Sequence, residues 1–127
     1  MPPCQGSPAA EILAPLATPS RTVAELTLEI AQMLRRHGAW CVHLDGGPGM
    51  RKGAPRLLAC YHGRFVAVEV KAPRGPGPTR TQRLELESLD RAGAITIVAR
   101  SVCEVEAVLE DLDRNPPEVR ALEQLIA

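Results

Sequence analysis

The stretch that decides the fold is GRFVAVEVK, residues 63–71, which alternates in the manner of a β-strand. Side chains two apart on a strand share a face, so three valines point one way and the residues between them point the other. Glu69 and Lys71 therefore lie side by side at the end of an otherwise apolar, central strand. This carboxylate and ammonium pair is the first candidate for chemistry. The alternative for a bare E-x-K triplet is that the strand ends at Val70 and both charges reach water.

The residues before this strand predict two further strands. Residues 39–44 are the first, residues 45–55 form a loop rich in glycine, and residues 57–61 are the second. Only His62 and Gly63 separate the second strand from the third, and this spacing predicts an antiparallel hairpin.

Helices are predicted on either side of these strands. Apolar residues recur at helical spacing over 22–37, over 79–91 with Thr79 or Thr81 as the cap, and over 101–113. Residues 94–99 form a continuous apolar strand, which predicts burial on both faces. The order of helix, three strands, helix, strand and helix predicts an α/β fold with a mixed sheet and a helical crossover.

Length and composition predict one domain. The chain has 127 residues, with 45% hydrophobic and 24% charged residues, as in globular proteins. We expect a mobile Pro-rich tail over 1–20, the domain over 21–114 and a C-terminal helical tail over 115–127. No apolar run approaches the ~20 residues that span a bilayer, so we expect a cytoplasmic protein with no membrane partner.

Aromatic residues are scarce, with one Trp, one Tyr and one Phe in the chain. Single-stranded nucleic acids usually stack on a row of aromatic side chains. The sequence therefore predicts no stacking platform of that kind.

The formal net charge of zero conceals an uneven distribution. Residues 51–83 contain eight basic residues and one acidic residue, whereas residues 84–127 contain four basic and ten acidic residues. A basic segment inside a neutral chain favours an anionic partner such as nucleic acid. The alternative is a solvated basic surface that acidic helices offset.

The four cysteines show no C-x-x-C spacing, and we expect reduced, mostly buried thiols. Cys41 with His43 and Cys60 with His62 are both Cys-x-His pairs, which two neighbouring strands could combine into a zinc set. This spacing is not typical of zinc sites, and the sequence favours the buried-thiol interpretation.

The chain resembles the PD-(D/E)XK nucleases, and more closely their VRR-NUC branch. The resemblance rests on KGAPRLL at 52–58, GRFVAVEVK at 63–71, Gln82, Ala-Gly at 92–93 and Arg-Ser at 100–101. It covers roughly residues 22–113. It implies a restriction-endonuclease-like αβββαβ core with a mixed central sheet flanked by helices.

The resemblance also implies metal-dependent hydrolysis of phosphodiesters. In such enzymes an acid after the proline, the Glu of E-x-K and often a Glu of the first helix hold Mg²⁺ or Mn²⁺. By this resemblance the catalytic candidates of the present chain are Glu69, Lys71 and Gln82. Glu25 is the candidate metal ligand of the first helix, with Glu29 as its alternative. Glu25 also follows Thr22 by three residues, so a helix-capping role is equally indicated.

The sequence departs from the family pattern at Arg56, where an Asp is expected after Pro55. Two unit charges ~4 Å apart interact by about 4 kcal/mol at an effective dielectric near 20. Replacing a carboxylate by a guanidinium therefore predicts impaired metal binding, with Arg56 paired to Glu69 or turned outward to a phosphate. Asp45 is the candidate substitute ligand, and a plain turn residue is the alternative.

The candidate DNA-binding residues flank this site in the sequence, and we expect them to flank it in space. They are Arg51, Lys52, Arg56, Arg64, Arg74, Arg80 and Arg83, and they predict contacts to the phosphate backbone without sequence reading. The resemblance implies a nuclease domain acting on DNA, including branched DNA, and the departure at Arg56 predicts impaired catalysis. The alternative is a non-catalytic domain that binds nucleic acid or scaffolds a partner. The cofactor is Mg²⁺ or Mn²⁺ in an active enzyme and none otherwise, and both a monomer and a homodimer stay open.

Overall fold

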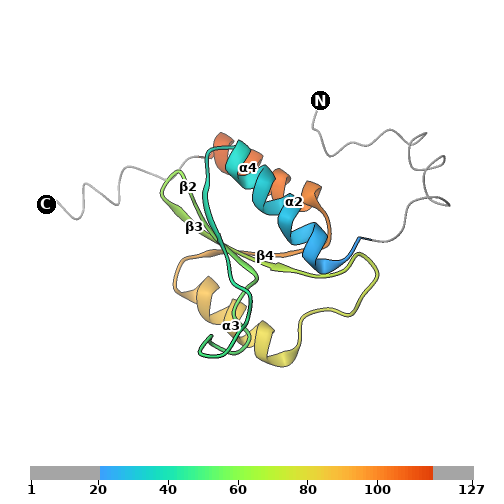
Figure 1. Cartoon of the computed structure of the whole chain (residues 1–127). Helices are drawn as coiled ribbons and strands as arrows, with labels where there is room; N and C mark the ends of the chain where they lie inside the picture. Colours follow the sequence, from blue (N-terminus) through green and yellow to red (C-terminus); the bar gives the residue numbers. More distant parts are fainter. Residues whose placement is uncertain (1–20, 116–127) are drawn as a thin grey trace, which may run out of the picture.

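The computed structural model describes residues 21–115, and Figure 1 shows a central sheet with α2 and α4 on one face and α3 on the other. The elements are α2 (Val23–Arg36), β1 (Trp40–His43), β2 (Leu57–Tyr61), β3 (Arg64–Val70), α3 (Arg80–Arg91), β4 (Ile95–Ala99) and α4 (Val102–Arg114). This is the predicted order. Apart from Asn115, which ends α4, the predicted tails lie outside the described residues.

The sheet has the strand order β1-β2-β3-β4. β1 pairs with β2 and β2 with β3 in antiparallel register, whereas β3 and β4 are parallel and joined by α3. Glu69 lies opposite Val98 of β4. The prediction that the E-x-K strand is central in a mixed sheet is therefore confirmed.

The β2–β3 hairpin closes through a two-residue turn. His62 and Gly63 have φ values of 48° and 79°, as a type I′ turn requires at both central positions. This turn fixes the register that pairs Leu57 with Val68 and Tyr61 with Arg64. The predicted hairpin is confirmed with its turn.

The core lies between the sheet and the α2–α4 layer. Val66, Val68 and Val70 are buried on this inner face, as the alternation of β3 predicts. Leu26 and Ile30 of α2 and Leu109 of α4 pack in the same cluster. The opposite, outer face of β3 carries Phe65, Ala67 and Glu69, and that face positions the candidate site.

The predicted burial of the last strand on both faces is wrong. β4 is an edge strand of the sheet, and Val98 is 37% exposed. Ile95 and Thr96 are only partly buried. Within residues 21–115 the outer face of β4 is covered by α3 alone, and Leu86 is the one buried residue of that helix.

Cys41 and Cys60 do not form a zinc site with their neighbouring histidines, and Cys4 lies outside the described residues. Cys41 pairs with Ala59, and Cys60 pairs with Trp40, so the two thiols lie on opposite faces of the sheet. No group of three His, Cys, Asp or Glu side chains within residues 21–115 could hold a metal ion. Cys60 is exposed rather than buried, which corrects the expectation for that residue. No helix in the described range is long and apolar enough to cross a bilayer.

Candidate functional site

Glu69 is the most unusual side chain of the outer face. It is 3% exposed, and its Oε2 atom has no hydrogen-bond partner among the residues that the structure describes. Burial raises the pKa of this carboxyl above its usual value of 4.5, while the charges of Lys71 and Arg56 and the backbone N–H of Val70 act in the opposite direction. A buried, half-satisfied carboxylate is costly, so it marks this position as a functional candidate.

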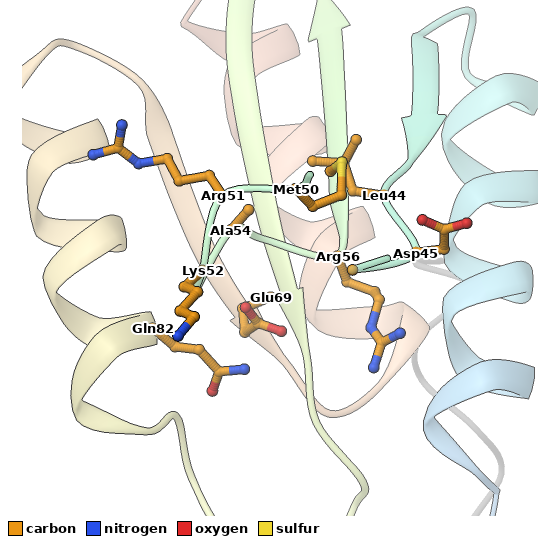
Figure 2. Close-up of a pocket in the computed structure, with 11 residues that line it drawn as sticks. Leu44, Asp45, Met50, Arg51, Lys52, Ala54, Arg56, Glu69 and Gln82 are labelled. Atoms are coloured by element: carbon orange, nitrogen blue, oxygen red, sulfur yellow. The ribbon is translucent and has the colours of Figure 1, made fainter. Parts of the chain in front are cut away.

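Glu69 lines a pocket of about 340 Å³, which Figure 2 shows in close-up. The long loop between β1 and β2 forms one wall, with Asp45, Arg51 and Lys52. Arg56 follows at the end of that loop, and Gln82 comes from the first turn of α3. The pocket thus joins residues that lie far apart in the sequence, and most of its charged side chains are cations.

Gly53 lets the loop approach α3. Its φ is +78°, and a Cβ atom there would lie 2.8 Å from the carbonyl oxygen of Thr81. No other residue fits a contact this close. The contact brings Lys52 beside Gln82 at the pocket wall (Figure 2).

Lys71 and Gln82, both predicted as catalytic, are directly bonded. Lys71 Nζ donates to Gln82 Oε1 at 2.7 Å. The same oxygen accepts the backbone N–H of Thr79 at 2.9 Å, and Thr79 accepts from the Gln82 N–H, which completes a capping box. The cap of α3 therefore also fixes the ammonium group, with Thr79 rather than Thr81 as the cap residue.

Arg56 fully matches neither of its two predicted arrangements, an ion pair with Glu69 or a side chain turned outward to a phosphate. Its backbone oxygen accepts from Leu44 N at 2.8 Å, and its side chain lines the pocket (Figure 2). Its charge acts on Glu69, but it forms no ion pair with any carboxylate in residues 21–115. The guanidinium is a near neighbour of Glu69 with donors left for a ligand.

Asp45 adopts the geometry of a turn residue. Its Oδ1 atom accepts the backbone N–H of Gly47 at 3.4 Å. Figure 2 shows its carboxylate turned away from Glu69, on the far side of Arg56. Asp45 lines the same pocket as Glu69, but the two carboxylates do not converge.

The acids of the first helix do not line this pocket. Thr22 caps α2 with Glu25 as its partner: Thr22 Oγ1 accepts the Glu25 N–H at 3.1 Å, and the same hydroxyl donates to the Glu25 carboxylate at 2.9 Å. Glu29 forms an ion pair with Arg21. Of the two roles indicated for Glu25, the structure places it in the capping role.

These positions bear on the metal ion that the resemblance implies. Mg²⁺ and Mn²⁺ prefer several carboxylate or carbonyl oxygens. The pocket offers Glu69 and the averted Asp45, and three cationic side chains line it with them. The residues present therefore do not fit a divalent cation, although Glu69 Oε2 itself would suit one.

The predicted DNA-binding residues divide into three groups. Arg51 Nε donates to Glu85 Oε2 at 2.6 Å, so its charge is paired. Arg64 begins β3, about 17 Å along the strand from Glu69, and the prediction that it flanks the site is wrong. The remaining five make no ion pair in the described part of the chain; we call Lys52, Arg56, Arg74, Arg80 and Arg83 the basic rim.

Sequence reasoning assigned no role to Arg100, which organises the loop before α3. Its Nη1 atom donates to the carbonyl oxygens of Ala72 at 2.6 Å and Gly75 at 2.8 Å. These bonds hold the segment that carries Arg74. The sequence signal was an arginine directly after the last apolar strand, but nothing in the pattern identified backbone carbonyls as its partners.

A comparison with solved structures finds a chain described as a VRR_NUC domain. It is 24% identical, with a TM-score of 0.54, and the match covers 76% of this chain and 100% of that chain. No protein-family model and no curated protein matches the sequence. The likeness shows a VRR_NUC-like, restriction-endonuclease-like α/β fold, and the predicted fold class is confirmed.

Proposed function

We propose that this domain binds the phosphate backbone of DNA through the basic rim and that its nuclease-type pocket is catalytically impaired. The observation that carries the proposal is the content of the pocket. One buried carboxylate, Glu69, stands beside the guanidinium of Arg56 where this type of fold would need a cluster of acids.

The binding half of the proposal rests on where the cations lie. Arg80 and Arg83 are exposed in the first turn of α3, and Lys52 is brought to the same turn by the contact of Gly53 with Thr81. Arg74 is exposed in the loop that Arg100 holds. Unpaired cations on neighbouring segments suit phosphates, which they contact without reading bases.

The catalytic half rests on charge. Divalent metal ions promote phosphodiester hydrolysis by polarising the phosphate and generating hydroxide. A single buried carboxylate beside a guanidinium holds such an ion weakly. The attraction between the ion and the carboxylate is similar in size to the repulsion between the ion and the guanidinium. Lys71 cannot replace the ion, because a charged ammonium accepts no proton.

The test is DNA binding measured by fluorescence anisotropy with a labelled duplex. We expect micromolar or weaker affinity that falls about 100-fold between 50 and 200 mM salt, as four phosphate contacts require. Arg80→Glu should weaken binding severalfold. The matched control is Arg91→Glu, an exposed arginine at the other end of α3, which should leave the affinity nearly unchanged. Absence of binding at low salt, or binding insensitive to salt, would rule out the proposal.

A further inference from the structure

Two of the three aromatic side chains are exposed on one face of the sheet. Trp40 is 67% exposed and Phe65 is 45% exposed, whereas Tyr61 is buried and donates to Asp113. The register places Trp40 opposite Cys60 and Cys60 opposite Phe65. Trp40, Cys60 and Phe65 therefore form one row across β1, β2 and β3, about 10 Å long. We call it the aromatic row.

The aromatic row lies on the same face as the candidate site. Phe65 and Glu69 are four residues apart on β3, so their side chains point the same way, about 13 Å apart. Phe65 lines an apolar groove of about 250 Å³, which shares Leu44, Met50, Arg51 and Ala54 with the pocket of Glu69. The groove and the pocket are thus neighbours on the outer face, lined in part by the same residues.

The groove itself is almost free of polar atoms. Pro55, Leu58 and Leu89 line it, and the charged groups of Arg51 and Glu85, which also line it, are paired with each other. Exposed apolar residues are unremarkable when scattered singly, but a contiguous set beside a charged pocket marks a binding surface. A ligand that fits both parts carries flat apolar faces and negative charges a few ångströms apart.

We propose that an unpaired nucleobase of DNA stacks on Phe65, with a second base of the same strand on Trp40, while the backbone that continues beyond the Phe65 base leads into the pocket with Arg56 and Lys52. This inference rests on the proposed DNA-binding function and names its ligand: DNA with a single-stranded segment. Bases in a duplex are already stacked and cannot reach the aromatic row. It departs from the sequence prediction of no stacking platform, because the register places two of the few aromatic residues in one row.

The experiment uses Trp40 as its own reporter, since the chain has one tryptophan. A short single-stranded oligonucleotide and the matching duplex are titrated at low salt, with tryptophan fluorescence and anisotropy recorded together. We expect the single strand to quench Trp40 and the duplex to leave it unchanged. Phe65→Leu keeps an apolar side chain but removes the ring, and it should weaken single-strand binding about five- to tenfold without affecting duplex binding.

Two controls separate stacking from folding. Phe65→Trp restores a ring and should restore single-strand affinity. Leu28→Ala removes an apolar side chain that is 58% exposed on α2, away from the outer face, and should change neither ligand. Thermal denaturation of each variant confirms that it is folded.

Four results would overturn the inference. Equal quenching by duplex, or an unchanged affinity in Phe65→Leu, would exclude base stacking while leaving the proposed backbone binding intact. Failure of both ligands to bind would remove the proposed function as well. Conversion of a dimer to a monomer in Phe65→Leu, seen by light scattering without a change in DNA affinity, would assign the face to a second copy of this chain.

Discussion

The side-chain oxygen of Gln82 joins Lys71 to the start of α3, because Gln82 Oε1 accepts hydrogen bonds from both Lys71 Nζ and the backbone N–H of Thr79. The end of the central strand and the first turn of α3 are thereby coupled through a single side chain. The ammonium next to Glu69 keeps its place because the helix cap holds its acceptor.

This coupling predicts unequal effects of two substitutions at Gln82. Gln82→Ala removes the acceptor for both donors and should lower the free energy of unfolding by about 1–2 kcal/mol. Gln82→Glu keeps an oxygen for the cap and for Lys71, and it should cost less than half as much. Urea denaturation of both variants measures the difference. Equal stability of the two variants would show that the shared oxygen contributes nothing.

The close approach of Gly53 to Thr81 predicts that substituting Gly53 by alanine lowers the stability of the fold more than the same substitution at Gly49. Gly53→Ala places a methyl group 2.8 Å from the carbonyl oxygen of Thr81. Gly49 also has a positive φ, of +88°, but a methyl group there would meet open space. A positive φ alone costs roughly 1–2 kcal/mol. We expect Gly49→Ala to cost that much and Gly53→Ala to cost more.

Gly53→Ala should also affect binding, because it moves the loop that carries Lys52 away from α3. Its DNA affinity should fall severalfold, while that of Gly49→Ala stays near the wild-type value. Anisotropy at low salt makes the comparison. Identical stability and affinity in the two variants would contradict the contact.

The buried carboxyl of Glu69 predicts a pH dependence of stability. Burial raises the pKa of Glu69 above its usual value of 4.5 in the folded state, so the folded protein binds the proton more tightly than the unfolded chain. Its contribution to stability is therefore full below pH 4.5 and is lost as pH rises through the folded pKa. Glutamine does not ionise, so Glu69→Gln removes this loss of stability at higher pH.

The measurable quantity is the difference in unfolding free energy between Glu69→Gln and the wild type across the pH range. We expect the unfolding free energy of Glu69→Gln to increase relative to that of the wild type as pH rises above 4.5. The difference should then level off. A difference that is constant with pH, or that moves in favour of the wild type, would mean that burial does not dominate at this carboxyl.

The ion pair of Arg51 with Glu85 predicts that two neighbouring cations contribute unequally to DNA binding. Arg51 is already bound to a carboxylate at 2.6 Å, whereas Lys52 has no such partner in residues 21–115. Lys52→Ala should weaken binding severalfold and reduce the salt dependence by about one ion. Arg51→Ala should change both much less, and the reverse order would disprove the assignment.

The local features of the fold could be predicted because they depend on neighbouring residues. The alternation of residues 65–70, the turn at His62 and Gly63 and the cap at Thr79 all follow from short-range geometry, and the structure contains each of them. The exposure of Val98 could not be predicted in this way. An apolar run has the same sequence whether its strand is central or at the edge of the sheet.

The candidate site was predictable in its residues and not in their partners. Glu69, Lys71 and Gln82 are brought to the same end of the sheet, as the resemblance implies. Arg64 was misplaced because proximity in sequence was taken for proximity in space, although an extended strand separates its ends. The partners of Arg51 and Arg100 come from segments more than 20 residues away, which no local pattern reveals.

The measurement that tests the central claim most directly is a calorimetric titration of Mn²⁺ and Mg²⁺ into the wild type and Arg56→Asp, with cleavage of duplex, flap and junction DNA followed in parallel. We predict no metal binding and no cleavage for the wild type, and metal binding in Arg56→Asp that a further Glu69→Ala abolishes and a further Asp45→Ala preserves. Metal-dependent cleavage by the wild type that Asp45→Ala eliminates would contradict the account.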